Sequence, residues 1–244
     1  MATLTREVHH DSRQSRTALL QMQMSEFWSG DLGLTLVSIS LVILIFVIFP
    51  LRQDGLSGRF FFDLVMVTLM VSGALVAKQS RTATIATVTL VIIGAGELAA
   101  SRIFPIPLLR HFSSLSAIII QLLYIRIVLL VMFRQGPVTW SRIQGGICAY
   151  LLTGLAWGSV FDFVEQVHPG SFHFVVAPVN TDQLTAKLLY FSFTTLTTVG
   201  YGDILPVAPF ARSLAIAEAI VGQLFPAILI GALVAMAMQA RAKP

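Results

Sequence analysis

Long apolar runs separated by short polar breaks dominate the pattern of this chain. A helix needs about 20 mainly apolar residues to cross roughly 30 Å of hydrocarbon. The sequence therefore predicts an all-α membrane protein with six transmembrane helices. The six runs are Leu32 to Phe49, Phe60 to Ala77, Thr82 to Ala100, Phe112 to Phe133, Ile143 to Phe161 and Ala211 to Gln239.

A seventh apolar stretch, from Leu184 to Val199, is too short to cross, and it follows a polar loop that contains Pro169 and Pro178. Backbone that leaves the helical form inside a membrane is tolerated only where protein or a water-filled cavity covers it. Gly200 and Gly202 follow this stretch, and glycine adopts torsions that residues with a β-carbon adopt poorly. We predict a half-helix that enters the membrane and returns as an extended loop.

These elements divide the chain into three parts: an amino-terminal segment (1–31), a four-helix bundle (32–135), and a last domain (136–244) of helix, outer loop, half-helix, extended loop and final helix. The mixed charges before residue 32 are unlike the basic segment of a signal peptide, so we expect none. Only six residues follow Met238, so we expect no regulatory cytoplasmic domain in this chain.

Composition supports a membrane setting and excludes nucleic acid as a partner. Of the 244 residues, 56% are hydrophobic and 11% are charged, with a mean hydropathy of +0.82. The formal charge is +4, but the basic residues are scattered singly and form no patch. Cys148 is the only cysteine, which excludes an intrachain disulfide.

The basic residues also predict the orientation. If both termini lie on one side, nine of the 16 basic residues lie on that side and six lie opposite, with Arg126 inside a helix. The excess favours cytoplasmic termini. From the short loops and compact chain we expect a multi-pass protein of a bacterial inner membrane.

The extended loop contains the residues that could bind an ion. Residues 198–203 read TVGYGD. Removing the water shell of a potassium ion requires oxygens that replace it, and converging backbone carbonyls supply them. Through Thr195 to Asp203 (TLTTVGYGD), the preceding half-helix and the helix on each side, residues 140–240 resemble the potassium channel superfamily. The arrangement is similar to its six-helix, single-pore bacterial type.

The resemblance implies a function and a set of ion ligands. The Thr198 hydroxyl and the main-chain oxygens of this loop would bind K⁺ at successive sites as the permeant ion, with no other cofactor. Gly202 and Asp203 would form the outer mouth, with Asp203 bracing the loop. The implied K⁺ ligands are Thr198, Val199, Gly200 and Tyr201.

Further residues are expected to support this loop. Tyr190 and Phe191 stand where the family often has two aromatic residues against the filter Tyr, here Tyr201. Thr194 stands where some relatives have a buried Glu. Glu218 lies in an apolar helix, where a carboxylate is costly enough to be functional or paired. Our hypothesis is that Glu218 lies behind the filter and bonds the half-helix of its own or a neighbouring subunit.

The final helix contains Gly222 at the family's hinge position and Pro226 one turn later. Glycine lowers helix rigidity and proline removes a backbone hydrogen bond, so the pair predicts a bend that could act as a gating hinge. The alternative is that Gly222 permits close helix packing.

The number of loops predicts the assembly. One TVGYG loop cannot surround an ion, and the chain has no internal repeat of it. We therefore expect a fourfold homotetramer in the lipid bilayer.

The charges of the first four helices do not decide which stimulus gates the channel. The fourth helix has Arg126 mid-span, without an arginine at every third position. Asp63 and Glu97 could pair with an arginine. The bundle is then either a voltage sensor with few charges or a non-sensing scaffold.

Other classes of function remain as alternatives. A voltage-gated potassium channel and a weakly selective cation channel are the nearest. A secondary transporter could also have six helices, but it would not need this loop and would show two similar halves. No catalytic constellation is present in the sequence, so an enzyme is not expected.

Overall fold

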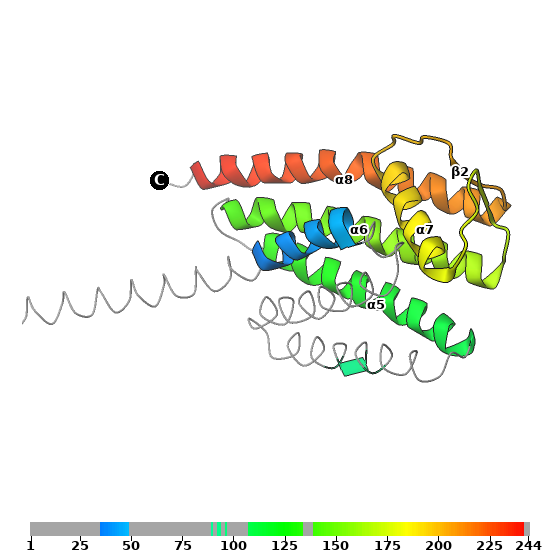
Figure 1. Cartoon of the computed structure of the whole chain (residues 1–244). Coiled ribbons are helices and arrows are strands. Elements are labelled where there is room, and N and C mark those ends of the chain that lie inside the picture. The colour runs from blue at the N-terminus through cyan, green and yellow to red at the C-terminus, as the bar shows by residue number, and fades with distance from the viewer. Residues whose placement is uncertain are drawn as a thin grey trace, which may run out of the picture.

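The computed structural model describes residues 35–48, 89, 92–93, 96, 107–133 and 139–241 (Figure 1). A first apolar helix (Thr35–Val47) ends in a π-helical turn. The labelled elements are, in chain order, η1 (Leu44–Ile48), α5 (Pro107–Met132), α6 (Trp140–Val167), β1 (Phe172–Phe174), α7 (Thr181–Leu196), β2 (Ile204–Pro206) and α8 (Pro209–Arg241).

Three long helices lie side by side, and the short helix α7 packs between α6 and α8 at one end (Figure 1). One buried apolar cluster joins the first helix, α5, α6 and α7 through residues such as Leu41, Val128, Leu152 and Leu189. A second cluster, around Phe161, joins α6, α7, both strands and the start of α8. α7 is therefore held from both flanks by apolar packing, which fixes where its carboxyl end points.

Among the described residues, three helices are long and apolar enough to cross a membrane: Arg110–Leu130, Arg142–Val167 and Pro209–Met238. They correspond to the fourth, fifth and sixth predicted spans. The described part of the first predicted span is helical but shorter, Thr35–Val47. The predicted spans 60–77 and 82–100 lie outside the described residues, apart from 89, 92–93 and 96, which are helical.

The half-helix begins at Thr181, three residues before the apolar stretch Leu184 to Val199, and ends at Leu196, just before the predicted end at Thr197 and Thr198. Its start is displaced because Asn180 caps it: the Asn180 side chain accepts a hydrogen bond from the amide of Gln183 at 2.9 Å. Its end is displaced because the loop turns at Thr198, whose φ of 60° is incompatible with a continuing right-handed helix.

Two short strands, which the apolar pattern did not predict, tie the outer loop to the segment after TVGYGD. β1 and β2 pair antiparallel, with His173 opposite Leu205. The Val175 amide donates to the carbonyl of Asp203 at 3.0 Å. Both sides of the TVGYGD loop are thus anchored, by α7 before it and by this hairpin after it.

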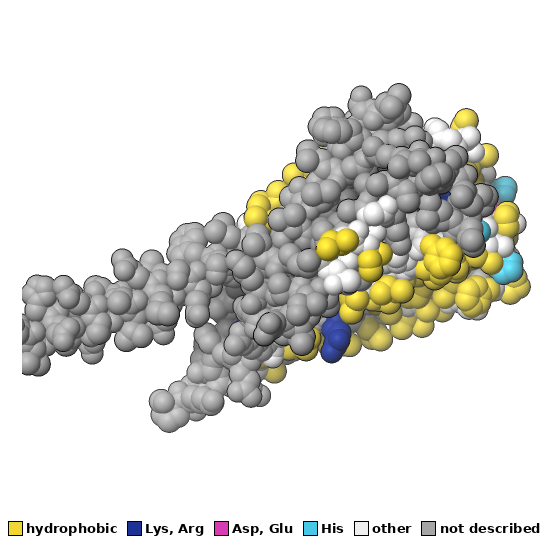
Figure 2. Space-filling view, turned by 90° about the horizontal axis from the view of Figure 1, so that it is seen from below, with side chains coloured by type: hydrophobic (Ala, Val, Ile, Leu, Met, Phe, Trp, Pro, Cys, Tyr) yellow, Lys and Arg dark blue, Asp and Glu magenta, His cyan; other side chains and the backbone are white. Residues whose placement is uncertain are grey.

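Large apolar side chains remain exposed along the helices, as expected of surfaces that face lipid or other subunits. Figure 2 shows them across the described part of one face, with histidine side chains at the end where the strands lie. On α8, Ile216, Ile220, Leu224 and Ile228 are each more than half exposed.

Candidate functional site

The TVGYGD loop begins with a turn at the carboxyl end of α7. The carbonyl oxygen of Thr194 accepts hydrogen bonds from the amides of Val199 at 2.8 Å and Gly200 at 3.2 Å. The Thr198 amide donates to the carbonyl of Thr195 at 2.9 Å. The N–H groups of the first three loop residues, Thr198 to Gly200, thus point back to the end of α7.

The loop turns through left-handed backbone torsions at three positions. Gly200 and Gly202 have φ values of 55° and 81°, a region that glycine adopts without a steric penalty. Thr198 has a φ of 60°, which is rare for a β-branched residue. Thr198 to Asp203 are all exposed within the single chain.

An aromatic ring supports the loop from α7. Tyr190 and Tyr201 stack with ring centroids 6.3 Å apart and planes 2° from parallel. The Asp203 carboxylate lies beside the Tyr190 hydroxyl. The structure therefore brings together two predicted support residues, Tyr190 and Asp203, and the predicted ion ligand Tyr201.

Phe191 packs elsewhere within the chain. Its ring lies 5.1 Å from that of Phe161 and 5.4 Å from that of Phe172, in edge-to-face contacts. One position along a helix turns a side chain by about 100°, so Phe191 points in a different direction from Tyr190. Both rings were predicted to pack on Tyr201. Within this chain, Tyr190 does so and Phe191 packs on Phe161 and Phe172 instead. The Thr194 hydroxyl bonds its own helix, at the carbonyl of Phe191, 2.9 Å away.

Glu218 lies behind α7, fully buried. Its Oε1 is 2.5 Å from the Ser192 hydroxyl, which also lies 2.7 Å from the carbonyl oxygen of Gly154 on α6. Ser192, which the sequence did not single out, therefore links three helices at one point. The only signal in the sequence for this role is that Ser192 is a small polar residue inside an apolar run.

Gly222 packs against the end of α7. A β-carbon at this position would overlap the carbonyl oxygen of Leu196, so only glycine fits here. The Tyr150 hydroxyl donates to that same carbonyl at 3.3 Å. α8 continues without interruption from Pro209 to Arg241, with Pro226 inside it. The close approach supports the packing role of Gly222, while the hinge role of Gly222 and Pro226 stays a prediction.

A polar cluster, unpredicted from the sequence, joins α5, α6 and α7 around the buried carboxylate of Asp162. Asp162 lies 2.5 Å from the Gln166 amide nitrogen, 3.1 Å from the Thr185 hydroxyl and 3.5 Å from the Ser114 hydroxyl. Arg110, 37% exposed, lies 3.7 Å from it. These contacts fix the start of α5 to the helix that ends at the TVGYGD loop.

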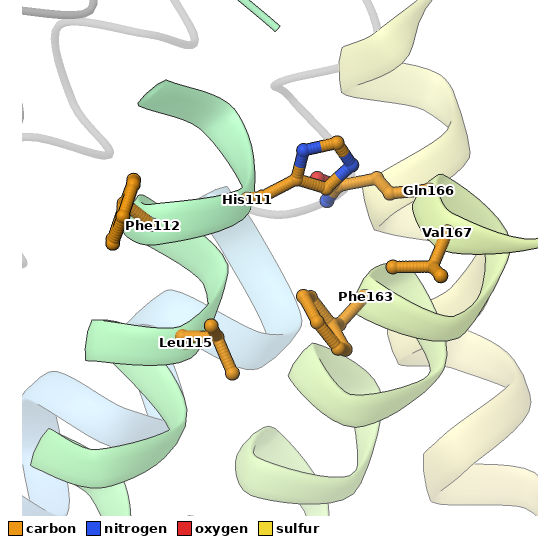
Figure 3. Close-up of a pocket in the computed structure, with 6 residues that line it drawn as sticks. All are labelled: His111, Phe112, Leu115, Phe163, Gln166 and Val167. Atoms are coloured by element: carbon orange, nitrogen blue, oxygen red, sulfur yellow. The ribbon is translucent and has the colours of Figure 1, made fainter. Parts of the chain in front are cut away.

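Beside this cluster, α5 and α6 border an open hollow of about 390 Å³. Its lining is mainly apolar, with His111 against Phe163 and near Gln166 (Figure 3). None of the predicted ion ligands lines it. Of the predicted sensor charges, Arg126 is exposed on α5, and Asp63 and Glu97 lie outside the described residues.

Comparison with known proteins identifies the region that contains this loop. The ion channel family model (Ion_trans_2) matches residues 149–239. Over 92 residues, the chain is 35% identical to the inward rectifier potassium channel Kirbac3.1 of Paramagnetospirillum magnetotacticum. Over 85 residues, it is 36% identical to the two pore potassium channel c of Oryza sativa subsp. japonica. Residues 149–239 are thus similar to the ion channel family, and both of these relatives are named as potassium channels.

The matched region begins within α6 and ends within α8, so it contains α7 and the TVGYGD loop. The two alignments cover 36% and 35% of this chain, and 26% and 17% of the two relatives. No solved structure matches the chain significantly. With three helices long and apolar enough to cross a membrane among its described residues, and a region similar to the ion channel family, the chain is an integral membrane protein.

Proposed function

We propose that this protein is a potassium-selective channel that passes K⁺ passively across the membrane through its TVGYGD loop. The observation that carries the proposal is the position of this loop, at the carboxyl end of a half-helix held between two membrane-length helices, inside the region matched by the channel family. Both relatives are named as potassium channels.

The ion ligands would be the carbonyls of Thr198 to Tyr201 and the Thr198 hydroxyl. The amides of Val199 and Gly200 bond back to Thr194, so the carbonyl oxygens can face the ion path. Such neutral oxygens replace the water shell of a dehydrated K⁺. Tyr190, stacked on Tyr201, would hold the loop at the width that this requires.

Four chains would form the pore, because one loop supplies ligands on only one side of an ion. The exposure of Thr198 to Asp203 in the single chain is consistent with a surface that the fourfold axis completes. In that assembly, the carboxyl ends of four α7 helices would point toward the cavity, where their partial negative charge favours a cation. The first four helices would surround this pore, with both termini in the cytoplasm of a bacterial cell.

A voltage-gated channel is the alternative within this class. It is less well supported, because Arg110 is tied to Asp162 of α6 and only Arg126 remains mid-span on α5. Moving one charge through 100 mV yields about 2.3 kcal/mol, so steep voltage dependence needs several such charges in each subunit. We therefore propose that α5 acts as part of a scaffold.

The test is the reversal potential of the purified protein in liposomes under opposing potassium and sodium gradients. A potential near the potassium equilibrium value is expected, since carbonyl sites favour K⁺ over Na⁺. Equal sodium permeability would contradict potassium selectivity and favour the weakly selective channel. Transport coupled to a second ion would instead favour a transporter.

A matched pair of glycine variants ties any flux to the loop. Gly200 and Gly170 both have positive φ and open space around the position of a β-carbon, so alanine strains both backbones similarly. Gly200→Ala should abolish K⁺ flux because it distorts the ion ligands, whereas Gly170→Ala should conduct. Equal flux from the two variants would mean that this loop is not the ion path.

A further inference from the structure

Gln223 is an exposed polar residue in the apolar helix α8, directly after Gly222. Its side-chain amide nitrogen donates a hydrogen bond to the Thr198 hydroxyl oxygen at 3.0 Å. The final helix therefore touches the first residue of the TVGYGD loop through a side chain. None of the supports described above reaches the Thr198 side chain.

Two observations give this contact a specific meaning. Thr198 has a left-handed backbone with a φ of 60°, and such strained torsions persist only where the surroundings fix them. The neighbouring Gly222 lies against the backbone of Leu196, at the end of α7. Backbone contact thus fixes the distance of Gln223 from the loop, so its side chain can hold the hydroxyl in one place.

We propose that Gln223 is a positioning residue that sets the cation affinity of the innermost ion site by holding the Thr198 hydroxyl. The inference rests on the proposed function, because it assumes that this hydroxyl is an ion ligand. A hydroxyl oxygen has two lone pairs and one hydrogen. Gln223 occupies one lone pair, and the other stays available to a cation.

The effect is one of preorganisation. Without the amide donor, the hydroxyl rotates among several positions, and binding a cation has to select one of them. Groups that are fixed in advance avoid this loss of freedom on binding. In a tetramer the loss would occur four times around the same ion, so modest contributions from each chain add up.

The experiment compares the full-length protein with Gln223→Met, which keeps the length of the side chain and removes its amide. The probe is Ba²⁺, a divalent cation close to K⁺ in size that binds the same kind of oxygens. Ba²⁺ affinity is measured as block of K⁺ flux in liposomes and as protection against thermal unfolding in sodium buffer. We expect Gln223→Met to weaken Ba²⁺ binding about tenfold by both readouts, from a loss of one neutral hydrogen bond in each chain.

Two further variants make the result decisive. Gln223→Asn keeps the amide but is one methylene too short to reach Thr198, so it should weaken Ba²⁺ binding as Gln223→Met does. If Gln223→Met does not assemble, the Ba²⁺ affinity of Gln223→Asn alone tests the inference. Leu224→Met is the control. It changes the adjacent exposed residue, and neither leucine nor methionine can donate a hydrogen bond to Thr198. This variant should bind Ba²⁺ as the wild type does.

The outcomes separate this inference from the proposed function. A potassium-selective wild type whose Gln223 variants bind Ba²⁺ equally well or more tightly would overturn the inference and leave the function intact. A wild type that neither selects K⁺ nor binds Ba²⁺ would overturn both. Weaker binding in the two Gln223 variants, with wild-type binding in Leu224→Met, would support the inference.

Discussion

Ser192 and Glu218 meet at 2.5 Å between the half-helix α7 and the final helix α8, and both side chains are completely buried. The same hydroxyl lies 2.7 Å from the carbonyl of Gly154 on α6. A single polar contact in an apolar core thus fixes the two helices that flank the TVGYGD loop against the one that carries it.

Removing one partner of this contact should destabilise the protein by more than the net contribution of one hydrogen bond. Ser192→Ala leaves the carboxyl group of Glu218 buried without its donor, which costs about 1–3 kcal/mol. We expect a lower unfolding temperature of the detergent-solubilised protein. Adding Glu218→Leu to Ser192→Ala should restore part of the loss, because it removes the unsatisfied group.

A control for that experiment is Ser159→Ala, since the Ser159 hydroxyl bonds only within its own helix, to the carbonyl of Leu155. Its effect on stability should be small. If the effects of Ser192→Ala and Glu218→Leu simply add, the two residues do not act as a pair.

Gly222 should tolerate no side chain. In Gly222→Ala, the new methyl group would overlap the carbonyl oxygen of Leu196, and overpacking of this kind costs about 1–3 kcal/mol. The variant should be less stable by thermal unfolding and should assemble poorly. Gly231→Ala makes the same change on the same helix with nothing within 4 Å, and it should be neutral or slightly stabilising, since alanine favours a helix.

This comparison also separates the two roles of Gly222. A hinge role predicts that Gly222→Ala assembles normally and opens less often in single-channel recordings. Normal stability together with altered opening would therefore contradict the packing role.

The Asp162 cluster should stabilise the protein mainly through its carboxylate and only weakly through Arg110. Asp162→Ala removes the hydrogen bonds that this carboxylate accepts from the Thr185 hydroxyl and the Gln166 amide. At about 0.5–1.5 kcal/mol for each bond, we expect a loss of about 1–3 kcal/mol. Arg110 is 37% exposed, and exposed ion pairs contribute about 0–1 kcal/mol. Arg110→Gln should therefore change the unfolding temperature little.

Electrical recordings test the same cluster. If α5 stays fixed to α6, Arg110→Gln should leave the voltage dependence of the current unchanged. A shift in that dependence would show that Arg110 moves in the membrane field, and it would favour the voltage-gated alternative.

The stacked pair Tyr190 and Tyr201 should maintain selectivity. Tyr190→Ala removes a ring contact worth about 0.5–1.5 kcal/mol, so the loop can relax and admit Na⁺. We expect the reversal potential to move away from the potassium value. Tyr190→Phe keeps the ring and should stay close to wild type; a shift of equal size in both variants would instead assign the effect to the hydroxyl near Asp203.

The apolar pattern predicted much of the described fold. The runs beginning at Phe112, Ile143 and Ala211 correspond to α5, α6 and α8. A helix that crosses a membrane needs a continuous run of apolar residues, and such a run can be seen directly in the sequence. The ends were less accurate: α6 continues to Val167 and α7 begins at Thr181. Helix ends depend on single capping contacts, such as that of Asn180, which an apolar average does not detect.

The sequence by itself determined the membrane class, the half-helix and the TVGYGD segment that follows it, since all three are properties of consecutive residues. Only the tertiary structure decided which distant side chains meet: Ser192 with Glu218, Gly222 with Leu196, Asp162 with Thr185, and Gln223 with Thr198. Each of these pairs joins two elements, so the meeting depends on the angle and rotation at which helices pack. Local periodicity carries no information about that geometry.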